Sequence, residues 1–126
     1  MERVKQELNE IEINGVAYVR KGAAPSMAVS TDGLPCVIVG AGIGGIHFGF
    51  LKNKTGQEVT LVQARRIQYW NGAASISEMA IRGVSKAADC RFSAAVPEIT
   101  LTQAVEIIPV SAAAQSNLNA VPIWTR

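Results

Sequence analysis

The sequence predicts a β-rich α+β domain. We expect a compact antiparallel sheet or a small, partly open barrel built from hairpins, with one short capped helix over about residues 75–82 and a second short helix as a candidate near the C-terminus. Three observations lead to this prediction. Asn14-Gly15 stands between two β-favouring runs, short apolar runs recur between Gly- and Pro-containing turns, and a single helix-capping signal begins at Ser75.

The composition argues against several classes of protein. The chain has 126 residues, enough for one domain with its own core, and we expect residues 1–126 to form that single domain. Its formal net charge is only +2, so no partner of the duplex DNA type is expected. The longest mainly apolar stretch, residues 34–51, is interrupted by glycines, and residues 1–10 mix charges of both signs. We therefore expect neither a membrane partner nor a secretion signal, and a cytoplasmic location.

The two cysteines predict no special chemistry. Cys36 and Cys90 lie far apart and lack the Cys-x-x-Cys spacing of zinc and redox sites, so both are expected to be reduced and packed. His, Cys, Asp and Glu form no cluster at metal-ligand spacing. The prediction is therefore that no metal and no cofactor is bound.

In the first half of the chain, residues 1–10 are expected to be a flexible or helical extension. Residues 11–19 carry β-branched and apolar residues on both sides of Asn-Gly, which predicts a hairpin with a type I′ turn. Residues 20–34 combine Gly, Pro, Ser and Asp-Gly with little periodicity and are expected to form a loop. Residues 58–62 alternate in polarity and residues 67–70 are again β-favouring, which predicts one long or bent strand.

In the second half, Ser75-Ile-Ser-Glu78 matches the capping box and predicts a helix that Gly83 ends. Residues 98–102 and 105–108 are expected to be two short strands broken by prolines at positions 97 and 109, because proline cannot donate to a ladder. Residues 112–120 are Ala-rich and can form a short helix, after which Trp124 is expected to act as an apolar anchor.

A glycine-rich segment supports two interpretations. Gly40, Gly42 and Gly45 follow an apolar run with the G-x-G-x-x-G spacing of dinucleotide-binding loops, and Gln63 stands where such a domain needs an acidic residue for the ribose. Residues 46–51, however, alternate large and small side chains and contain a glycine, which favours a strand over the required crossover helix. The preferred interpretation is a glycine-bearing hairpin with residues 52–56 as its turn, and the alternative is a minimal FAD- or NAD-binding oxidoreductase.

One block of sequence carries a resemblance to a known family. Ala64-Arg65-Arg66, followed by Tyr69-Trp70-x-Gly-Ala-Ala-Ser75, resembles a family of short uncharacterised proteins of tailed bacteriophages and prophages, and the likeness spans roughly residues 11–124. Members of that family do not carry the complete dinucleotide fingerprint. This chain departs from them at position 68, where it has Gln in place of the usual aromatic residue. The resemblance implies a phage setting, with the host cytoplasm as the location, and no particular activity.

The densest group of polar and aromatic residues leads from a predicted strand into the start of the helix. Guanidinium groups bind phosphate, aromatic faces stack on bases and capped helix starts accept anions, so this group could bind a small nucleotide. The structural alternative is that the aromatic residues are core or interface anchors, that Ser75 is only a cap and that one arginine is ion-paired. The candidate ligand-binding residues are Arg65, Arg66, Tyr69, Trp70, Asn71, Ser75, Ser77 and Phe48, with Arg20 and Lys21 at the start of the loop.

These residues lead to a hypothesis for function. No catalytic motif accompanies His47, which is expected to be packed, so we expect no enzyme. The first hypothesis is a homo-oligomeric phage binding protein that sequesters a small phosphorylated ligand, such as a cyclic nucleotide or an ADP-ribose derivative, and so inhibits host anti-phage signalling. The alternative is an interaction or assembly module of a phage that binds proteins through apolar edges around Trp70 and Trp124.

Overall fold

The structure is a computed structural model that describes residues 10–13, 16–19, 29–30 and 32–125. In chain order its elements are β1 (Glu10–Ile13), β2 (Val16–Val19), β3 (Cys36–Gly40), the 3₁₀ turn η1 (Gly42–Gly44), β4 (Ile46–Thr55), β5 (Glu58–Tyr69), α1 (Ile76–Arg82), the 3₁₀ turn η2 (Ala87–Asp89), β6 (Arg91–Phe92), β7 (Val96–Leu101), β8 (Glu106–Pro109) and α2 (Ala112–Asn119).

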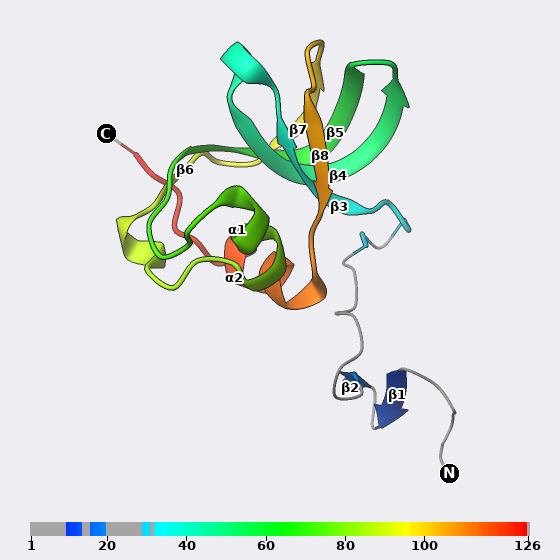
Figure 1. Ribbon diagram of the computed structural model, residues 1–126, viewed down its shortest axis with the longest axis vertical. Helices are drawn as coiled ribbons and strands as arrows, with labels where there is room; N and C mark the ends of the chain where they lie inside the picture. Colours follow the sequence, from blue (N-terminus) through cyan, green and yellow to red (C-terminus); the bar gives the residue numbers. More distant parts are fainter. Residues whose placement is uncertain (1–9, 14–15, 20–28, 31, 126) are drawn as a thin grey trace.

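Six strands form one antiparallel sheet, as predicted. Its order is β6-β5-β4-β3-β8, and β7 pairs with the same edge of β5 that β6 uses further along. The sheet is strongly curled (Figure 1), which brings β7 and β8 to the same region of the molecule. No described residue pairs β7 with β8, so the described sheet is a partly open barrel.

Two irregularities bend the central hairpin of β4 and β5. Between the pairs Phe48↔Arg65 and Phe50↔Val62, β5 has one residue more than β4. Gln63 lies at this bulge with a positive φ of 51°, a conformation that non-glycine residues rarely adopt. A Cβ atom on Gly49 of β4 would lie 3.0 Å from the Ala64 Cα of β5, so β4 needs glycine at this position. The long, bent strand expected from the sequence is therefore confirmed, and a bulge is the cause of its bend.

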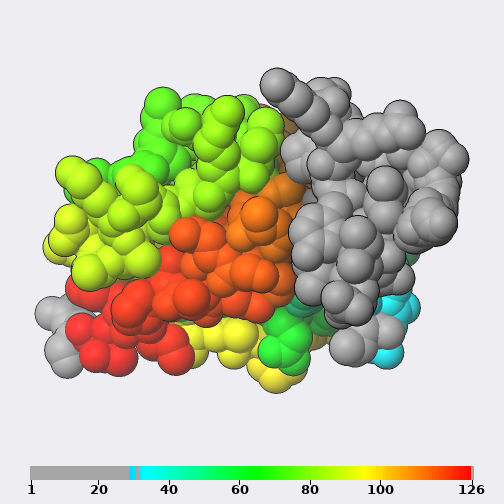
Figure 2. All heavy atoms as spheres, turned by 90° about the horizontal axis from the view of Figure 1, so that it is seen from below, coloured from blue at the N-terminus to red at the C-terminus, as the bar shows by residue number. Residues whose placement is uncertain are grey.

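The two faces of the sheet carry separate apolar clusters. The inner cluster fills the concave side and draws residues from strands across the barrel: Val37, Val39, Ala41, Val59, Leu61, Ala64 and Leu101. The outer cluster joins the other face to α1 and α2, and includes Ile38, Phe48, Ile67, Met79, Phe92, Val110 and Leu118. Figure 2 shows α1, the segment that follows it, α2 and the C-terminal tail packed side by side beneath the sheet.

Side-chain caps define both helices. Ser75 caps α1 by accepting from the Glu78 backbone N–H at 3.1 Å, and Gly83 ends the helix with a φ of 78°, both as predicted. The Glu78 carboxylate accepts from the N–H of Ala74, one residue before the position expected for a capping box. Ser111 caps α2 and also donates its hydroxyl to the Ile81 carbonyl at 2.7 Å, which joins the end of α1 to the start of α2.

Several local expectations need correction. The β4–β5 turn is at residues 56–57, and residues 52–55 belong to β4, because the bulges extend the pairing as far as Thr55↔Glu58. Pro97 and Pro109 do not break strands but lie near the ends of β7 and β8. Each of these strands pairs on one side only, so the missing N–H costs no ladder bond. The turn at Asn14-Gly15, the extension at residues 1–9 and most of the predicted loop lie outside the described residues.

Strands β1 and β2 pair antiparallel with Ile13 opposite Val16, in agreement with the predicted hairpin. The C-terminal helix is confirmed as α2. Within the described ranges, no helix has the length and apolar character needed to cross a membrane.

Candidate functional site

The glycine-rich segment is a connection between two antiparallel strands. β3 pairs with β4 directly across it, from Gly40↔Ile46 to Cys36↔Phe50, and η1 closes the turn. Residues 46–55 are strand, so no crossover helix starts at Gly45 to receive a diphosphate. Gly42 and Gly45 have positive φ angles that this turn requires. The geometry therefore fits the preferred hairpin interpretation and lacks the βαβ unit that the dinucleotide alternative with Gln63 needs.

Arg65 is buried and bonds to backbone carbonyls of the fold. Only 6% of the residue is exposed, and its guanidinium donates to the carbonyls of Ser93 at 2.7 Å and Leu118 at 3.1 Å. The Leu118 carbonyl belongs to the last turn of α2, where a cation is favoured by the helix dipole. Cζ also lies 5.2 Å from the ring centre of Phe92. Burial lowers the pKa of Arg65 below its ordinary value. The expectation that Arg65 lines the same ligand site as its neighbour therefore does not fit the geometry.

Arg66 lies on the inner face and is exposed. Its Nη1 donates to the Gly44 carbonyl at 2.7 Å, and His47 Nε2 donates to the same oxygen at 2.8 Å. The backbone N–H of Arg66 donates to the Ser93 hydroxyl at 2.8 Å, which fixes this end of β5. The turn that carries Gly44 thus orients the guanidinium group of an exposed residue.

His47 is packed, as expected from the sequence. It is 1% exposed and pairs across the sheet with Arg66. Burial, and second the charge of Arg66, lower its pKa from 6.5 to about 4. The imidazole is therefore neutral near pH 7, and its Nε2 proton is committed to Gly44.

Arg66 separates two hollows in the inner face. One, of about 350 Å³, is mainly apolar. The other, of about 260 Å³, is more polar and is lined in part by residues at the end of β7. The first is lined by His47, Ala64, Arg66, Ser93, Ala94, Val96 and Ile99, and the second by Ala41, Gly44, Arg66, Ile99, Thr100, Leu101, Thr102 and Gln103. Among the described lining residues there is no carboxylate and no other Lys or Arg.

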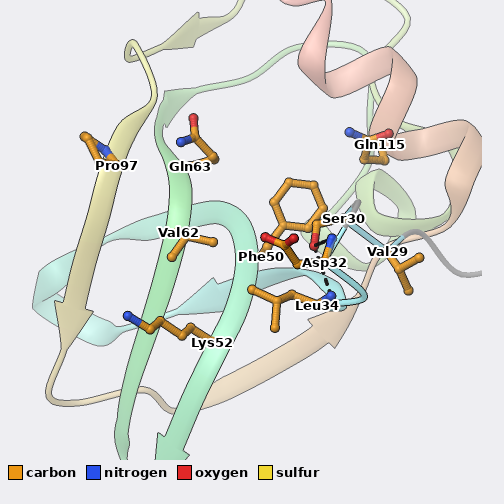
Figure 3. A pocket seen from close by; sticks show the side chains of 10 residues that line it. All are labelled: Val29, Ser30, Asp32, Leu34, Phe50, Lys52, Val62, Gln63, Pro97 and Gln115. Atoms are coloured by element: carbon orange, nitrogen blue, oxygen red, sulfur yellow. Dashed lines mark hydrogen bonds between the residues drawn. The ribbon is translucent and has the colours of Figure 1, made fainter.

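A third hollow, of about 770 Å³, lies on the outer face of the sheet. Figure 3 shows the Phe50 ring near Ser30 and Asp32, with Gln115 of α2 above them and Lys52 further along β4. The Lys52 ammonium is paired with Glu98 at 2.9 Å, and Asp32 adds a negative charge. This hollow is therefore electrostatically unsuited to a phosphorylated ligand.

The aromatic candidates Trp70 and Tyr69 make different contacts. Trp70 is half-buried and donates its indole N–H to the Ala73 carbonyl at 3.1 Å, so it anchors the start of the loop before α1. Tyr69 is 50% exposed and lies beside Arg91, whose Cζ is 5.9 Å from the ring centre. Cζ of Arg91 is also 5.1 Å from the ring centre of Trp124, the expected apolar anchor of the tail, which is 39% exposed.

The other predicted residues do not converge on Arg66. Phe48 is a member of the outer cluster, Ser75 is the helix cap and Ser77 is an exposed residue of α1. The N–H of Asn71 is directed at the thiol of Cys90, 3.4 Å away. Arg20 and Lys21 lie outside the described residues.

Sequence reasoning missed residues in and just after β7, and one residue of β6. Thr100, Thr102 and Gln103 line the polar hollow, although they follow Arg66 by more than 30 residues. No spacing motif links them to Arg66, because the curl of the sheet brings them together. Arg91 of β6 lies near two aromatic rings on another part of the surface. The cysteine prediction is confirmed: Cys36 and Cys90 are buried and free, and burial raises the pKa of the Cys36 thiol to about 12.

Comparisons with known proteins identify the family of this chain. Among the described residues, no group of His, Cys, Asp and Glu could hold a metal ion. Neither a curated protein nor a solved structure matches the chain. A family model matches residues 34–118, which include the whole described sheet from β3 to β8 and nearly all of α2. On that match the chain belongs to the family described as a domain of unknown function, DUF6948.

Proposed function

We propose that this protein binds a small phosphorylated ligand without chemical conversion, at the inner face around Arg66. The observation that carries the proposal is the exposed Arg66 guanidinium, which donates to the Gly44 carbonyl and lines both hollows. Guanidinium groups form charge-assisted, bidentate hydrogen bonds with phosphate oxygens. Because no carboxylate among the described lining residues competes for Arg66, the local charge favours an anion.

The two hollows differ in a way that suits a nucleotide. The apolar hollow, with Ala64, Val96 and Ile99 in its wall, can cover a planar base. The polar hollow offers the hydroxyl and amide groups of Thr102 and Gln103 to a sugar or a phosphate. Volumes of about 350 and 260 Å³ fit a base on one side of the arginine and a ribose phosphate on the other.

The charge of the site narrows the ligand class. Arg66 is the only Lys or Arg among the described lining residues, so a single phosphodiester charge is matched and a diphosphate is left partly uncompensated. A cyclic nucleotide is therefore a better fit than an ADP-ribose derivative. His47, the one titratable base in the lining, is buried and has its Nε2 proton committed to Gly44, which supports binding without catalysis.

The resemblance to proteins of tailed phages suggests a biological role for the binding of such a ligand. A protein that holds an intact signalling nucleotide lowers its free concentration by mass action, in proportion to the number of sites. We propose that this protein sequesters a nucleotide signal of the host's anti-phage defence in the host cytoplasm, and that it does so as a homo-oligomer. Native mass spectrometry of the purified protein reports the number of subunits and any retained ligand together.

Calorimetric titration tests the binding site. We expect saturable binding of at least one cyclic nucleotide from a panel of 3′,5′-cyclic AMP, cyclic dinucleotides and ADP-ribose. Arg66→Gln should weaken it at least roughly tenfold, as the loss of a charge-assisted hydrogen bond implies. Arg82→Gln is the matched control, because Arg82 is an exposed arginine of α1 whose partner is Glu78 at 3.6 Å. Bound ligand should be recovered unchanged after denaturation. Absence of binding across the panel, or equal binding by Arg66→Gln, contradicts the proposal.

A further inference from the structure

Another exposed arginine lies on a different part of the surface, beside the C-terminal end of β5. Arg91 of β6 is exposed and has the ring of Tyr69 at 5.9 Å and the ring of Trp124 at 5.1 Å from Cζ. We call these three residues the arginine–aromatic patch. Ile123, 56% exposed, continues it along the C-terminal tail.

Backbone pairing holds the patch in place. Tyr69 pairs with Arg91 across the β5–β6 ladder, and the N–H of Trp124 donates to the Phe92 carbonyl at 2.9 Å. Ile123 forms a parallel bridge with Phe92, whose side chain is completely buried. The aromatic rings therefore stand on a fixed support, which lowers the entropy cost of binding a partner there.

The chemistry of the patch identifies the kind of group that it can bind. Two aromatic rings within cation–π distance shield part of the guanidinium from water, while its remaining N–H groups stay available as a fork of donors. Among the described residues no carboxylate is paired with Arg91. Tyr, Trp and Arg are the residue types that contribute most to binding energy at protein interfaces.

We propose that the arginine–aromatic patch docks an acidic segment of a partner protein, in which an Asp or Glu carboxylate meets Arg91 and a neighbouring apolar side chain lies on Trp124 and Ile123. This inference is independent of the nucleotide site, because the described linings of the two hollows at Arg66 share no residue with the patch.

Charge favours this occupant over two others. A second copy that met this surface about a twofold axis through the patch would bring one Arg91 against the other, and like charges at an interface are unfavourable. Single-stranded nucleic acid needs a groove with several cations along the backbone. The patch has one cation, and the chain carries a formal net charge of only +2.

The test uses the full chain as bait for a displayed library of random 12-residue peptides. We expect the selected peptides to be enriched in Asp or Glu next to Leu, Phe or Trp. Binding of a synthesised hit, measured by fluorescence polarisation, should weaken at least tenfold in Arg91→Gln and in the peptide whose acid is replaced by its amide. The two changes made together should weaken binding no further than either alone. Arg82→Gln is the matched control, and unchanged circular dichroism shows that each variant is folded.

Three outcomes overturn the inference. The first is a selection that yields no binders, or binders without acidic enrichment. The second is a hit whose affinity is unaffected by Arg91→Gln. The third is binding of another class through the patch: light scattering that shows a wild-type oligomer dissociated by Arg91→Gln, or an oligothymidylate whose binding is lost in that variant.

Discussion

The stability of this protein should depend on pH through its single histidine. His47 is 1% exposed and neutral in the folded state, with a pKa lowered from 6.5 to about 4 by burial and by the charge of Arg66. As the pH falls through 6.5, the unfolded chain binds the proton first, so protonation favours unfolding. The stability that neutral His47 contributes is therefore complete above pH 6.5 and is lost as the pH falls to about 4.

The loss of stability follows from the difference between the pKa of His47 in the unfolded and the folded chain. This pKa difference lowers the unfolding free energy by about 3 kcal/mol once the pH is below the folded-state pKa, and by about 2 kcal/mol between pH 7 and pH 5. Urea unfolding followed by tryptophan fluorescence at pH 7, 6 and 5 measures it. His47→Gln is the comparison, because glutamine has an amide donor for the Gly44 carbonyl but no titration in this range. The difference in pH dependence between the two proteins isolates His47 from the carboxylates.

An NMR titration gives an independent check. The chain has one histidine, so its ring signal is assigned without ambiguity. We expect a titration midpoint near pH 4 in the folded protein. A midpoint near the ordinary value of 6.5, or wild type and His47→Gln losing equal stability on acidification, refutes the reasoning.

Substitutions at three further positions test the fold, each measured by chemical denaturation. Arg65→Met should lower the unfolding free energy by roughly 2 kcal/mol, because it leaves the carbonyls of Ser93 and Leu118 without their donor; a neutral result would show that the buried guanidinium does not hold α2 to the sheet. Gly83→Ala should cost more than about 2 kcal/mol, because φ is 78° and a Cβ there would overlap the Asn117 side chain; wild-type stability would contradict this geometry. Gln63→Val should destabilise by about 1–3 kcal/mol and Gln63→Gly by much less, since the positive φ suits glycine; the reverse order would exclude the bulge.

The elements of the fold could be predicted because their signals are local. Ser75 and Gly83 mark the two ends of α1 within nine residues, and both act as the sequence indicates. The alternation of residues 58–62 predicts a strand of β5 with Val59 and Leu61 on one face, and both belong to the inner cluster. The glycine motif alone is ambiguous, and the strand pattern that follows it decides in favour of the hairpin.

The candidate site was predicted less completely because its residues are assembled by the curl of the sheet. Thr102 and Gln103 come to Arg66 only when β7 folds back along β5, and Arg91 meets Trp124 through the pairing of the tail with β6. Adjacent residues of a strand point to opposite faces, so Arg65 and Arg66 could not line one site. The opposite orientation of the two arginines could therefore be predicted from the sequence. Which of the two is buried could not be predicted in this way.

The bulge at Gln63 determines which arginine is buried. Val59 and Leu61 face the inner cluster, so uninterrupted alternation would place Arg65 on the inner face and Arg66 against the helices. One extra residue in β5 reverses the order, as a register shift of one always does.

The sequence gives one sign of this reversal. Gly49 lies where a side chain would collide with the backbone of Ala64, and a glycine inside a strand is a known mark of a bulge. After the bulge, Ala64 belongs to the inner cluster, Arg65 reaches the end of α2 and Arg66 reaches the carbonyl of Gly44. A single backbone conformation, at a residue that adopts it only under constraint, therefore selects which arginine is buried against α2 and which is exposed on the inner face.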